Sequence, residues 1–251
     1  MELFFKMKNL GIKKAFLQLY RGEFATEATF VAFMGCEELQ IPIEKFDLKD
    51  IGTLDIKKDT IVLGGVTAVR HALTILNIVP PPPIDIPDEL NLYTRRDMKT
   101  GTIKHFMEHG KFPLFVKPTK PKLFTGMVVS SPDELSFLSA LDLAADESNI
   151  ITSSVVNFVA EFRVFVIDKK IVDCRRYSGN FEVNPDFDFI RATIASYSTQ
   201  PIAYAIDFGV TDEDVIMLIE VNDGYSIGSY GLSHRDYVRL CMLRWNQIVG
   251  N

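Results

Sequence analysis

The chain has 251 residues, of which 47% are hydrophobic and 24% are charged, a composition that is typical of a folded globular protein and excludes a largely disordered one. Its formal net charge of −6 argues against a nucleic-acid backbone as the main partner. The scattered cysteines Cys36, Cys174 and Cys241 lack the spacing of zinc sites, which indicates reduced thiols and a cytoplasmic protein. Residues 1–14 lack the apolar core of a signal peptide, and no run approaches the roughly 18 apolar residues of a membrane span, so no membrane partner is expected.

The N-terminal third of the chain predicts a small α/β unit. It is expected to contain three strands, at 15–20, 41–48 and 59–65, and two helices, at 27–39 and 66–76. The run VPPPPIDIP at 79–87 can neither continue a helix nor lie inside a sheet. We therefore place a domain boundary at residue 85.

The rest of the chain predicts a mixture of strands and helices. The expected elements are a helical region at 94–110, a strand at 112–118, a helix at 131–144, two or three strands within 149–179, a helix near 186–198, a strand pair at 202–222 and a final helix from about 233. Asp168 and Lys169 are expected at the turn of a hairpin.

The last strand of this series, 216–222, carries a carboxylate among apolar residues. Strict alternation would place Ile216, Leu218 and Glu220 on one face, with both faces of the strand covered. A buried carboxylate is costly without a partner, so Glu220 needs a cationic or hydrogen-bonding one. If the hairpin loop has an even length, Asp207 shares a face with Glu220 and Asn222, and such oxygen ligands suit Mg²⁺. The structural alternative is a set of acids at strand ends in contact with water.

Two further stretches carry charged residues in apolar surroundings. In FVKPTKPKLFTGM (115–127), Lys117 ends a strand and opens a loop, where a lysine can contact phosphate or simply lie at the surface. In VVNFVAEFRVFVI (155–167), Glu161 and Arg163 lie on one face of a strand and could form a structural pair.

Taken in order, these stretches resemble the ATP-grasp superfamily. The segments are FVKP (115–118), VVNFVAEFRVFVI (155–167), AIDFG (205–209) and IEVNDGYSIGSYG (219–231). Their spacing is similar to the D-alanine:D-alanine ligase branch, and the chain resembles small, divergent bacterial and phage members. The resemblance covers about positions 95–245. It implies an α+β fold in which two α+β lobes clamp ATP, preceded by a small α/β pre-ATP-grasp domain. The implied domains are 1–85 and 86–251, the latter with a lid lobe at about 95–155 and a metal-binding lobe at about 156–251.

The resemblance also implies roles for individual residues. Lys117 would contact the α- and β-phosphates, the segment 155–157 would contact adenine, and Glu161 would bind the ribose. The expected cofactor-binding residues are Lys117, Lys120, Val155, Val156, Asn157, Glu161, Arg96 and Lys104, the expected catalytic residues are Lys117, Arg163 and Arg176, and the expected magnesium ligands are Asp207, Glu220 and Asn222. The loop DGYSIGSYG (223–231) would face the acceptor substrate.

The chain departs from the family pattern near the phosphates. Ala205 stands where the family often has an arginine, so that Arg163 and Arg176 are expected to meet the phosphate charge. Three residues compete for the role of the first grasp lysine: Arg95, Arg96 and Lys104.

The implied function is an ATP-dependent carboxylate–amine or carboxylate–thiol ligase that works through an acyl phosphate. Its cofactors would be ATP and Mg²⁺, and its substrates a small-molecule or peptide carboxylate and an amine. Two alternatives stay open: a small-molecule kinase that uses the same nucleotide site, and a non-catalytic nucleotide-binding or scaffold protein. No nucleic-acid partner is expected, and a homodimer is compatible with the sequence.

Overall fold

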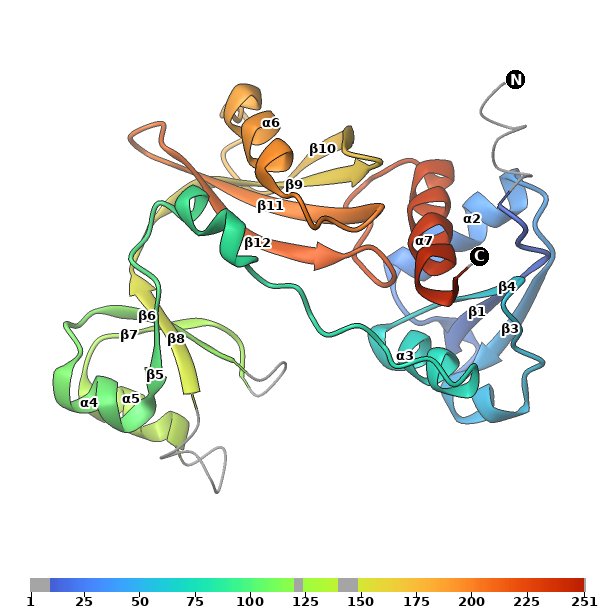
Figure 1. Cartoon of the computed structure of the whole chain (residues 1–251), viewed down its shortest axis with the longest axis horizontal. Coiled ribbons are helices and arrows are strands. Elements are labelled where there is room, and N and C mark those ends of the chain that lie inside the picture. Colours follow the sequence, from blue (N-terminus) through green and yellow to red (C-terminus); the bar gives the residue numbers. More distant parts are fainter. Residues whose placement is uncertain (1–9, 120–123, 140–148, 251) are drawn as a thin grey trace. The chain divides into compact units, whose positions relative to one another are not determined.

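The computed structural model describes residues 10–119, 124–139 and 149–250 and has the α+β fold expected from the sequence (Figure 1). It divides into two compact units, one formed by Met1–Tyr93 with Val159–Asn251 and the other by Thr94–Phe158. The predicted N-terminal domain thus packs in the same unit as the C-terminal strands, and the predicted lid lobe lies within the second unit. Among the described residues, no helix is long and apolar enough to cross a membrane.

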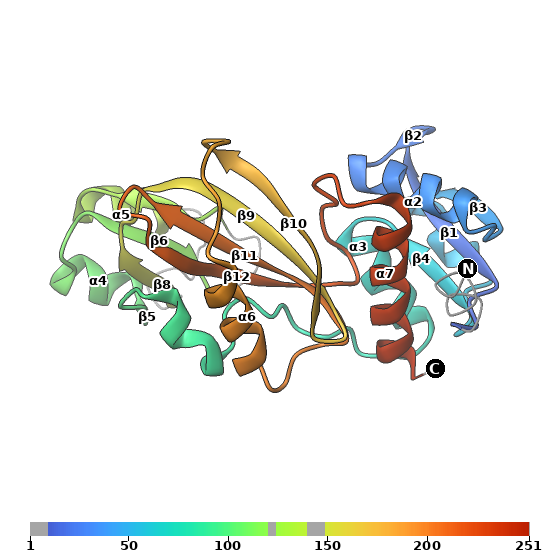
Figure 2. The ribbon, with the colours of Figure 1, turned by 90° about the horizontal axis from the view of Figure 1, so that it is seen from above.

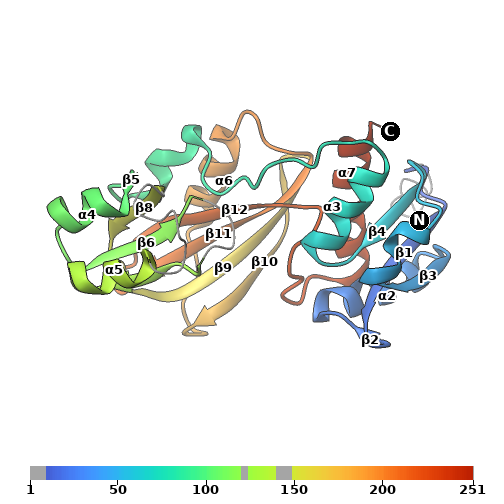
Figure 3. The same cartoon turned by 90° about the horizontal axis from the view of Figure 1, so that it is seen from below.

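The N-terminal part of the first unit is a four-stranded sheet with accompanying helices. Its strands are β1 (Lys14–Tyr20), β2 (Glu23–Phe24), β3 (Ile43–Asp47) and β4 (Thr60–Leu63), and its helical segments are α2 (Glu27–Glu38), the 3₁₀ helix η1 (Leu48–Thr53) and α3 (Val66–Ile75). Strand β1 pairs in parallel with β3 and β4 and antiparallel with β2. Helices α2 and α3 pack against this sheet (Figure 3), which confirms the predicted α/β unit.

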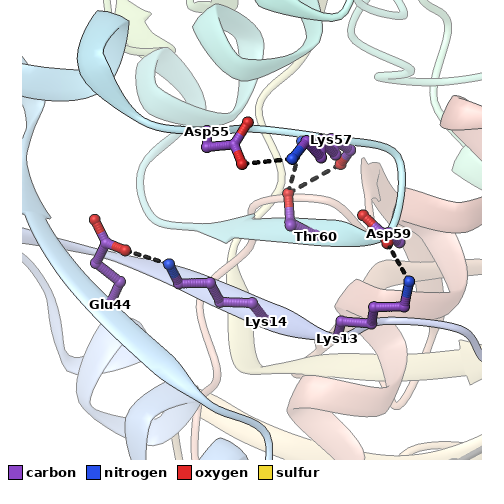
Figure 4. A network of polar contacts seen from close by, with 7 residues as sticks. All are labelled: Lys13, Lys14, Glu44, Asp55, Lys57, Asp59 and Thr60. Carbon is purple, nitrogen blue, oxygen red and sulfur yellow. Dashed lines mark hydrogen bonds and ion pairs between the residues drawn. The ribbon is translucent and has the colours of Figure 1, made fainter.

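Ion pairs decorate the rim of this sheet (Figure 4). They join Lys13 to Asp59, Lys14 to Glu44 and Lys57 to Asp55. All six side chains are substantially exposed, and such pairs contribute only about 0–1 kcal/mol each. The cohesion of the N-terminal sheet therefore comes from its apolar core.

A second four-stranded sheet completes the first unit. Its strands are β9 (Phe158–Ile167), β10 (Lys170–Gly179), β11 (Ala203–Thr211) and β12 (Ile216–Asp223), in the order β10-β9-β11-β12. The 3₁₀ helix η2 (Asp88–Thr94) and the helices α6 (Phe187–Ser196) and α7 (His234–Val249) belong to the same unit. Asp168 and Lys169, with φ of 50° and 61°, form the β9–β10 turn as predicted.

The two faces of the second sheet pack into different cores. On one face, Phe162, Ile206 and their neighbours pack against α6, which lies over the sheet (Figure 1). On the other face, Phe165 and Ala205 join a core that also contains α7 and the N-terminal strands. Helix α7 runs beside those strands (Figure 2). The N-terminal sheet and the second sheet are thus parts of one apolar core.

Strand β12 does not alternate strictly, because a β-bulge interrupts its pairing with β11. Asp207 is paired with Glu220, and the next residue of β11 is paired with Leu218, so that Ile219 is the extra residue. Leu218 and Val221 are both buried against α6 as a result, and Glu220 lies with Asp207 on the other face. The predicted alternation, with Leu218 and Glu220 on one face, is therefore wrong.

The second unit is a four-stranded sheet covered by two helices. Its elements are β5 (Lys99–Thr102), α4 (Ile103–His109), β6 (Leu114–Pro118), β7 (Met127–Val129), α5 (Pro132–Ser139) and β8 (Asn149–Ser154), with the strand order β5-β8-β6-β7. Residues 140–144 of the predicted fourth helix lie outside the described residues. The predicted helical region 94–110 is partly wrong, because β5 pairs with β8 and the Thr102 hydroxyl caps α4 by accepting from the His105 amide.

Candidate active site

Five polar side chains gather on the face of the second sheet that is turned away from α6. They come from three adjacent strands: Glu161 and Arg163 from β9, Asp207 from β11, and Glu220 and Asn222 from β12. Their neighbours along the strands, such as Phe162 and Ile206, belong to the core on the opposite face. The convergence of Asp207, Glu220 and Asn222 expected from the sequence is therefore present.

Arg163 and Asp207 form a bidentate ion pair at the centre of this cluster. The Arg163 Nε donates to Asp207 Oδ1 at 2.8 Å and Nη2 donates to Oδ2 at 2.6 Å, and the two residues are only 7% and 2% exposed. Burial raises the pKa of Asp207 to about 6, an effect that the Arg163 guanidinium opposes. Sequence reasoning had considered Glu161 as the structural partner of Arg163, but the observed partner is Asp207.

Asn222 links the two carboxylates of the cluster. Its Nδ2 donates to Asp207 Oδ2 at 3.3 Å and to Glu220 Oε1 at 2.9 Å. Glu220 Oε1 also lies 4.0 Å from Nη2 of Arg163. The Glu220 side chain is 42% exposed, so the expectation of a buried carboxylate is wrong, and solvent as well as these two residues compensates its charge.

The composition of the cluster fits a hard divalent cation. Two carboxylates and one amide lie within hydrogen-bonding reach of each other, and the exposure of Glu220 leaves the cluster accessible from solvent. A half-turn of the Asn222 amide would present its carbonyl oxygen, the atom that binds such ions. Among the described residues, no group of three or more His, Cys, Asp and Glu is arranged to hold a metal, and the present set differs by its asparagine.

Two tyrosines that sequence reasoning missed complete the cluster. The Tyr177 hydroxyl donates to Glu161 Oε2 at 2.7 Å, and burial raises the pKa of Tyr177 well above its usual value. The Tyr230 ring lies 4.6 Å from the Arg163 guanidinium carbon and 5.2 Å from the Tyr177 ring. Both tyrosines lie in stretches that had attracted attention for their arginines and glycines, and no spacing singled out the aromatic residues.

Arg176 is not brought to the cluster. It pairs across β10 and β9 with Phe162, whose side chain lies in the core on the α6 face. Its Nη1 donates to the carbonyl of Gly179 at 2.5 Å. This placement gives no support to the expectation that Arg176 joins Arg163 in meeting phosphate charge.

The remaining predicted site residues belong to the second unit. Lys117 on β6 pairs with Ile151 of β8, on the face of that sheet opposite the core residue Val116. Residues 155–157 connect β8 to β9, and Val155 is 41% exposed. Arg96 is half-buried and Lys104 is exposed on α4, whereas Lys120 lies outside the described residues.

The second unit contains a pocket of about 610 Å³ beside α4. His105, His109, Lys99 and Thr152 are among its lining residues, and Val155 is the predicted cofactor-binding residue that lines it among those described. Lys117 does not line it. The pocket is thus distinct from the polar cluster and from the face that carries Lys117.

A protein-family model described as an ATP-grasp domain, the second family of its clade, matches residues 93–240, which is more than half of the chain. The chain belongs to this ATP-grasp family. The match confirms the superfamily that the sequence motifs indicate and includes β9, β11, β12 and all five residues of the polar cluster. None of the curated proteins matches this ATP-grasp chain.

Solved structures share the ATP-grasp fold with this chain at low sequence identity. D-alanine–D-alanine ligase from Bacillus anthracis, complexed with ATP, is 15% identical over 94% of this chain and 98% of its own, with a TM-score of 0.56. N5-carboxyaminoimidazole synthase from Aspergillus clavatus, in complex with ADP and a ribonucleotide, is 15% identical over 93% and 77%, with a TM-score of 0.55. D-cycloserine synthetase DcsG is 12% identical over 93% and 99%, with a TM-score of 0.59. At this identity the likeness shows the fold alone.

Proposed function

We propose that this ATP-grasp protein is a magnesium-dependent ligase that couples ATP cleavage to the joining of a carboxylate with an amine or thiol. The observation that carries the proposal is the cluster of Asp207, Glu220 and Asn222 next to the buried Arg163, on one face of the second sheet. A metal–phosphate site needs oxygen ligands and a fixed cation side by side, and the cluster supplies both. The titles of two structural neighbours, which report bound ATP and ADP, support the choice of nucleotide.

The residues of the cluster divide between the metal and the nucleotide. Asp207, Glu220 and Asn222 would hold Mg²⁺, which when bound supplies charge compensation for the β- and γ-phosphates. Arg163 adds a permanent positive charge, because a guanidinium stays protonated at all physiological pH values. Glu161, held by the Tyr177 hydroxyl, offers a carboxylate to the ribose hydroxyls. Lys117 would contact the phosphates as a point charge.

The proposed reaction has two steps. A carboxylate oxygen of the substrate attacks the γ-phosphorus of ATP, the bond to the bridging oxygen breaks, and ADP leaves with that electron pair. The amine or thiol of the second substrate then attacks the carbonyl carbon of the acyl phosphate, loses its proton and releases inorganic phosphate. The protein needs no covalent nucleophile, since positioning and charge compensation lower both barriers.

The binding half of this proposal is tested by thermal stability. A ligand that binds only the folded protein stabilises it, by about 2.7 kcal/mol at 100 times its Kd. We expect millimolar ATP with magnesium to raise the melting temperature, and chelation of magnesium to remove most of the rise. We also expect ATP to stabilise more than GTP, because backbone groups near residues 155–157 would read adenine. An unchanged melting temperature with ATP and magnesium would falsify the proposal.

The catalytic half is tested by identifying the phosphorus-containing products. Phosphorus NMR of reactions with mixtures of amino acids and short peptides should show ADP and inorganic phosphate together with a coupled product. A kinase would instead leave the phosphoryl group on its substrate. Tight ATP binding with no turnover on any acceptor would favour the non-catalytic alternative.

A further inference from the structure

Tyr230 combines a half-exposed side chain with a tightly specified position. It lies in the loop between β12 and α7 and is 45% exposed, so that burial of its ring explains little of its placement. Its φ of 45° lies in the left-handed region, which costs on the order of 1 kcal/mol for a non-glycine residue. The loop therefore adopts an unfavourable backbone conformation in order to place a ring that gains little from burial.

The residues on either side of Tyr230 hold the loop around this ring. A Cβ atom at Gly228 would come within 2.7 Å of the Tyr230 ring, so only glycine leaves room for it. Ser229 is fully buried, and its hydroxyl bonds to the Glu27 carboxylate at 2.6 Å. Gly231 follows with φ of 83°. The loop is thus anchored next to Tyr230 while the ring itself points to the polar cluster.

The Tyr230 ring contacts Arg163, the buried cation of the cluster. The guanidinium carbon lies 4.6 Å from the ring centroid, a distance at which a cation–π interaction is favourable. Asp207 binds the edge of the same guanidinium through Nε and Nη2. The ring of Tyr177, whose hydroxyl bonds to Glu161, lies 5.2 Å from that of Tyr230. Tyr230 therefore has contacts on both the metal-ligand side and the Glu161 side of the cluster.

We propose that Tyr230 is a positioning residue: its ring holds the Arg163 guanidinium on the carboxylate cluster, where that charge serves the phosphates of the nucleotide. This inference rests on the proposed function. It assigns a role to the loop that carries Tyr230, since the loop reaches the phosphate site through a ring–cation contact as well as facing the acceptor. Loss of the ring should reduce the affinity for ligands with β- and γ-phosphates and leave the fold intact.

The first test measures the placement of Arg163 without nucleotide. Nuclei over the face of an aromatic ring resonate upfield, so the Arg163 side-chain N–H signal, assigned by its loss in Arg163→Lys, should be shifted in the wild type. We expect Tyr230→Phe to keep the shift and Tyr230→Leu to lose it. A signal that is the same in the wild type and in Tyr230→Leu would show that the ring does not hold the guanidinium.

The second test measures binding by calorimetry with two ligands, a non-hydrolysable ATP analogue with magnesium, and AMP. We expect Tyr230→Leu to weaken binding of the ATP analogue roughly tenfold while AMP binding changes less than about twofold, and Tyr230→Phe to restore both. The control is Tyr20→Leu, which removes a 62% exposed tyrosine whose ring lies 5.2 Å from the Arg21 guanidinium carbon on the N-terminal sheet. This variant should bind both ligands as the wild type does.

The outcomes separate this inference from the proposed function. If the wild type binds the ATP analogue and Tyr230→Leu binds it equally well, the positioning role is refuted and the proposed function stands. Equal weakening for AMP and the ATP analogue would also refute the role, because a general distortion of the site predicts it. If the wild type binds neither ligand, the proposed function fails and the positioning role falls with it.

Discussion

Arg163 on β9 and Asp207 on β11 neutralise each other inside the second sheet through two hydrogen bonds of 2.8 and 2.6 Å. Both side chains have lost nearly all contact with water, and so each depends on the other for charge compensation. Removal of one partner leaves a buried charge, which is more costly than the pair itself is favourable. The ion pair is thus a structural element of the sheet as well as part of the proposed site.

The first prediction concerns the stability of this pair. Asp207→Asn keeps the shape of the side chain but leaves the Arg163 guanidinium without its carboxylate. We expect a loss of about 3 kcal/mol in the free energy of unfolding, measured by urea denaturation. The matched control is Asp173→Asn, which removes the carboxylate bound to Arg175, a side chain that is 43% exposed. This control should cost no more than about 1 kcal/mol, and equal losses in the two variants would contradict the prediction.

The second prediction separates metal binding from stability at Glu220. The side chain is 42% exposed, and a glutamine can still accept the bond from Asn222. Glu220→Gln should therefore change the free energy of unfolding by less than about 0.5 kcal/mol. Because one negative ligand is lost, we expect the affinity for Mg²⁺ in the presence of ATP to fall at least about tenfold, as it does even for outer-shell losses. A magnesium titration of the thermal shift measures this fall, and an unaltered magnesium dependence would remove Glu220 from the metal site.

The third prediction concerns Lys117 of the second unit. The residue lies on the sheet face opposite the core residue Val116, so its truncation should not disturb that core. Lys117→Ala should weaken ATP binding by roughly tenfold or more, because a charged hydrogen bond contributes about 1.5–3 kcal/mol. Lys111→Ala, at an exposed lysine of the same unit, is the control for a simple loss of positive charge. Circular dichroism should show both variants folded, and a misfolded Lys117→Ala with normal ATP affinity would make Lys117 structural.

The fourth prediction concerns acid stability and Glu89 in η2. The hydroxyl and amide groups of Ser198, followed by those of Thr199, bond to the Glu89 carboxylate and lower its pKa to about 2 from an ordinary value of 4.5. A lowered pKa in the folded state means that the stabilisation is complete above pH 4.5 and is lost as the pH falls toward 2.

We expect wild type to melt at a higher temperature than Glu89→Gln at pH 6, and the difference to shrink between pH 4.5 and pH 2. The control, Asp188→Asn, removes an exposed carboxylate paired with Arg191 and should produce little change. A difference between the wild type and Glu89→Gln that does not vary with pH would refute the role assigned to the ionised carboxylate.

Most helices and strands could be predicted because their patterns are local. The strands 149–179 and the turn at Asp168 and Lys169 follow from apolar runs separated by two polar residues. The strand Lys99–Thr102 could not be predicted in this way, because its four residues contain no large apolar side chain and its pairing with β8 is a tertiary contact. The fold family became recognisable only from several motifs taken in order.

The candidate site was predictable in its membership but not in its pairing. Asp207, Glu220 and Asn222 followed from their positions in a hairpin, yet the face of Glu220 depends on the bulge at Ile219, which no residue type announces. The partner of Arg163 depends on which strands are neighbours in the sheet, and that order is not local information. The role of a tyrosine ring over the guanidinium depends on loop geometry for the same reason.

The proline run at 79–87 has a consequence for the sheet edge that β12 forms. Strand β12 is the outermost strand of its sheet, and an outer strand with unpaired backbone groups invites pairing with another molecule. Asp85 makes an isolated bridge to Val221, whose amide donates to the Asp85 carbonyl at 2.6 Å. Since prolines lack the amide hydrogen that a ladder needs, this bridge cannot extend into a further strand. The segment thereby shields the edge beside the candidate site from aggregation without enlarging the sheet.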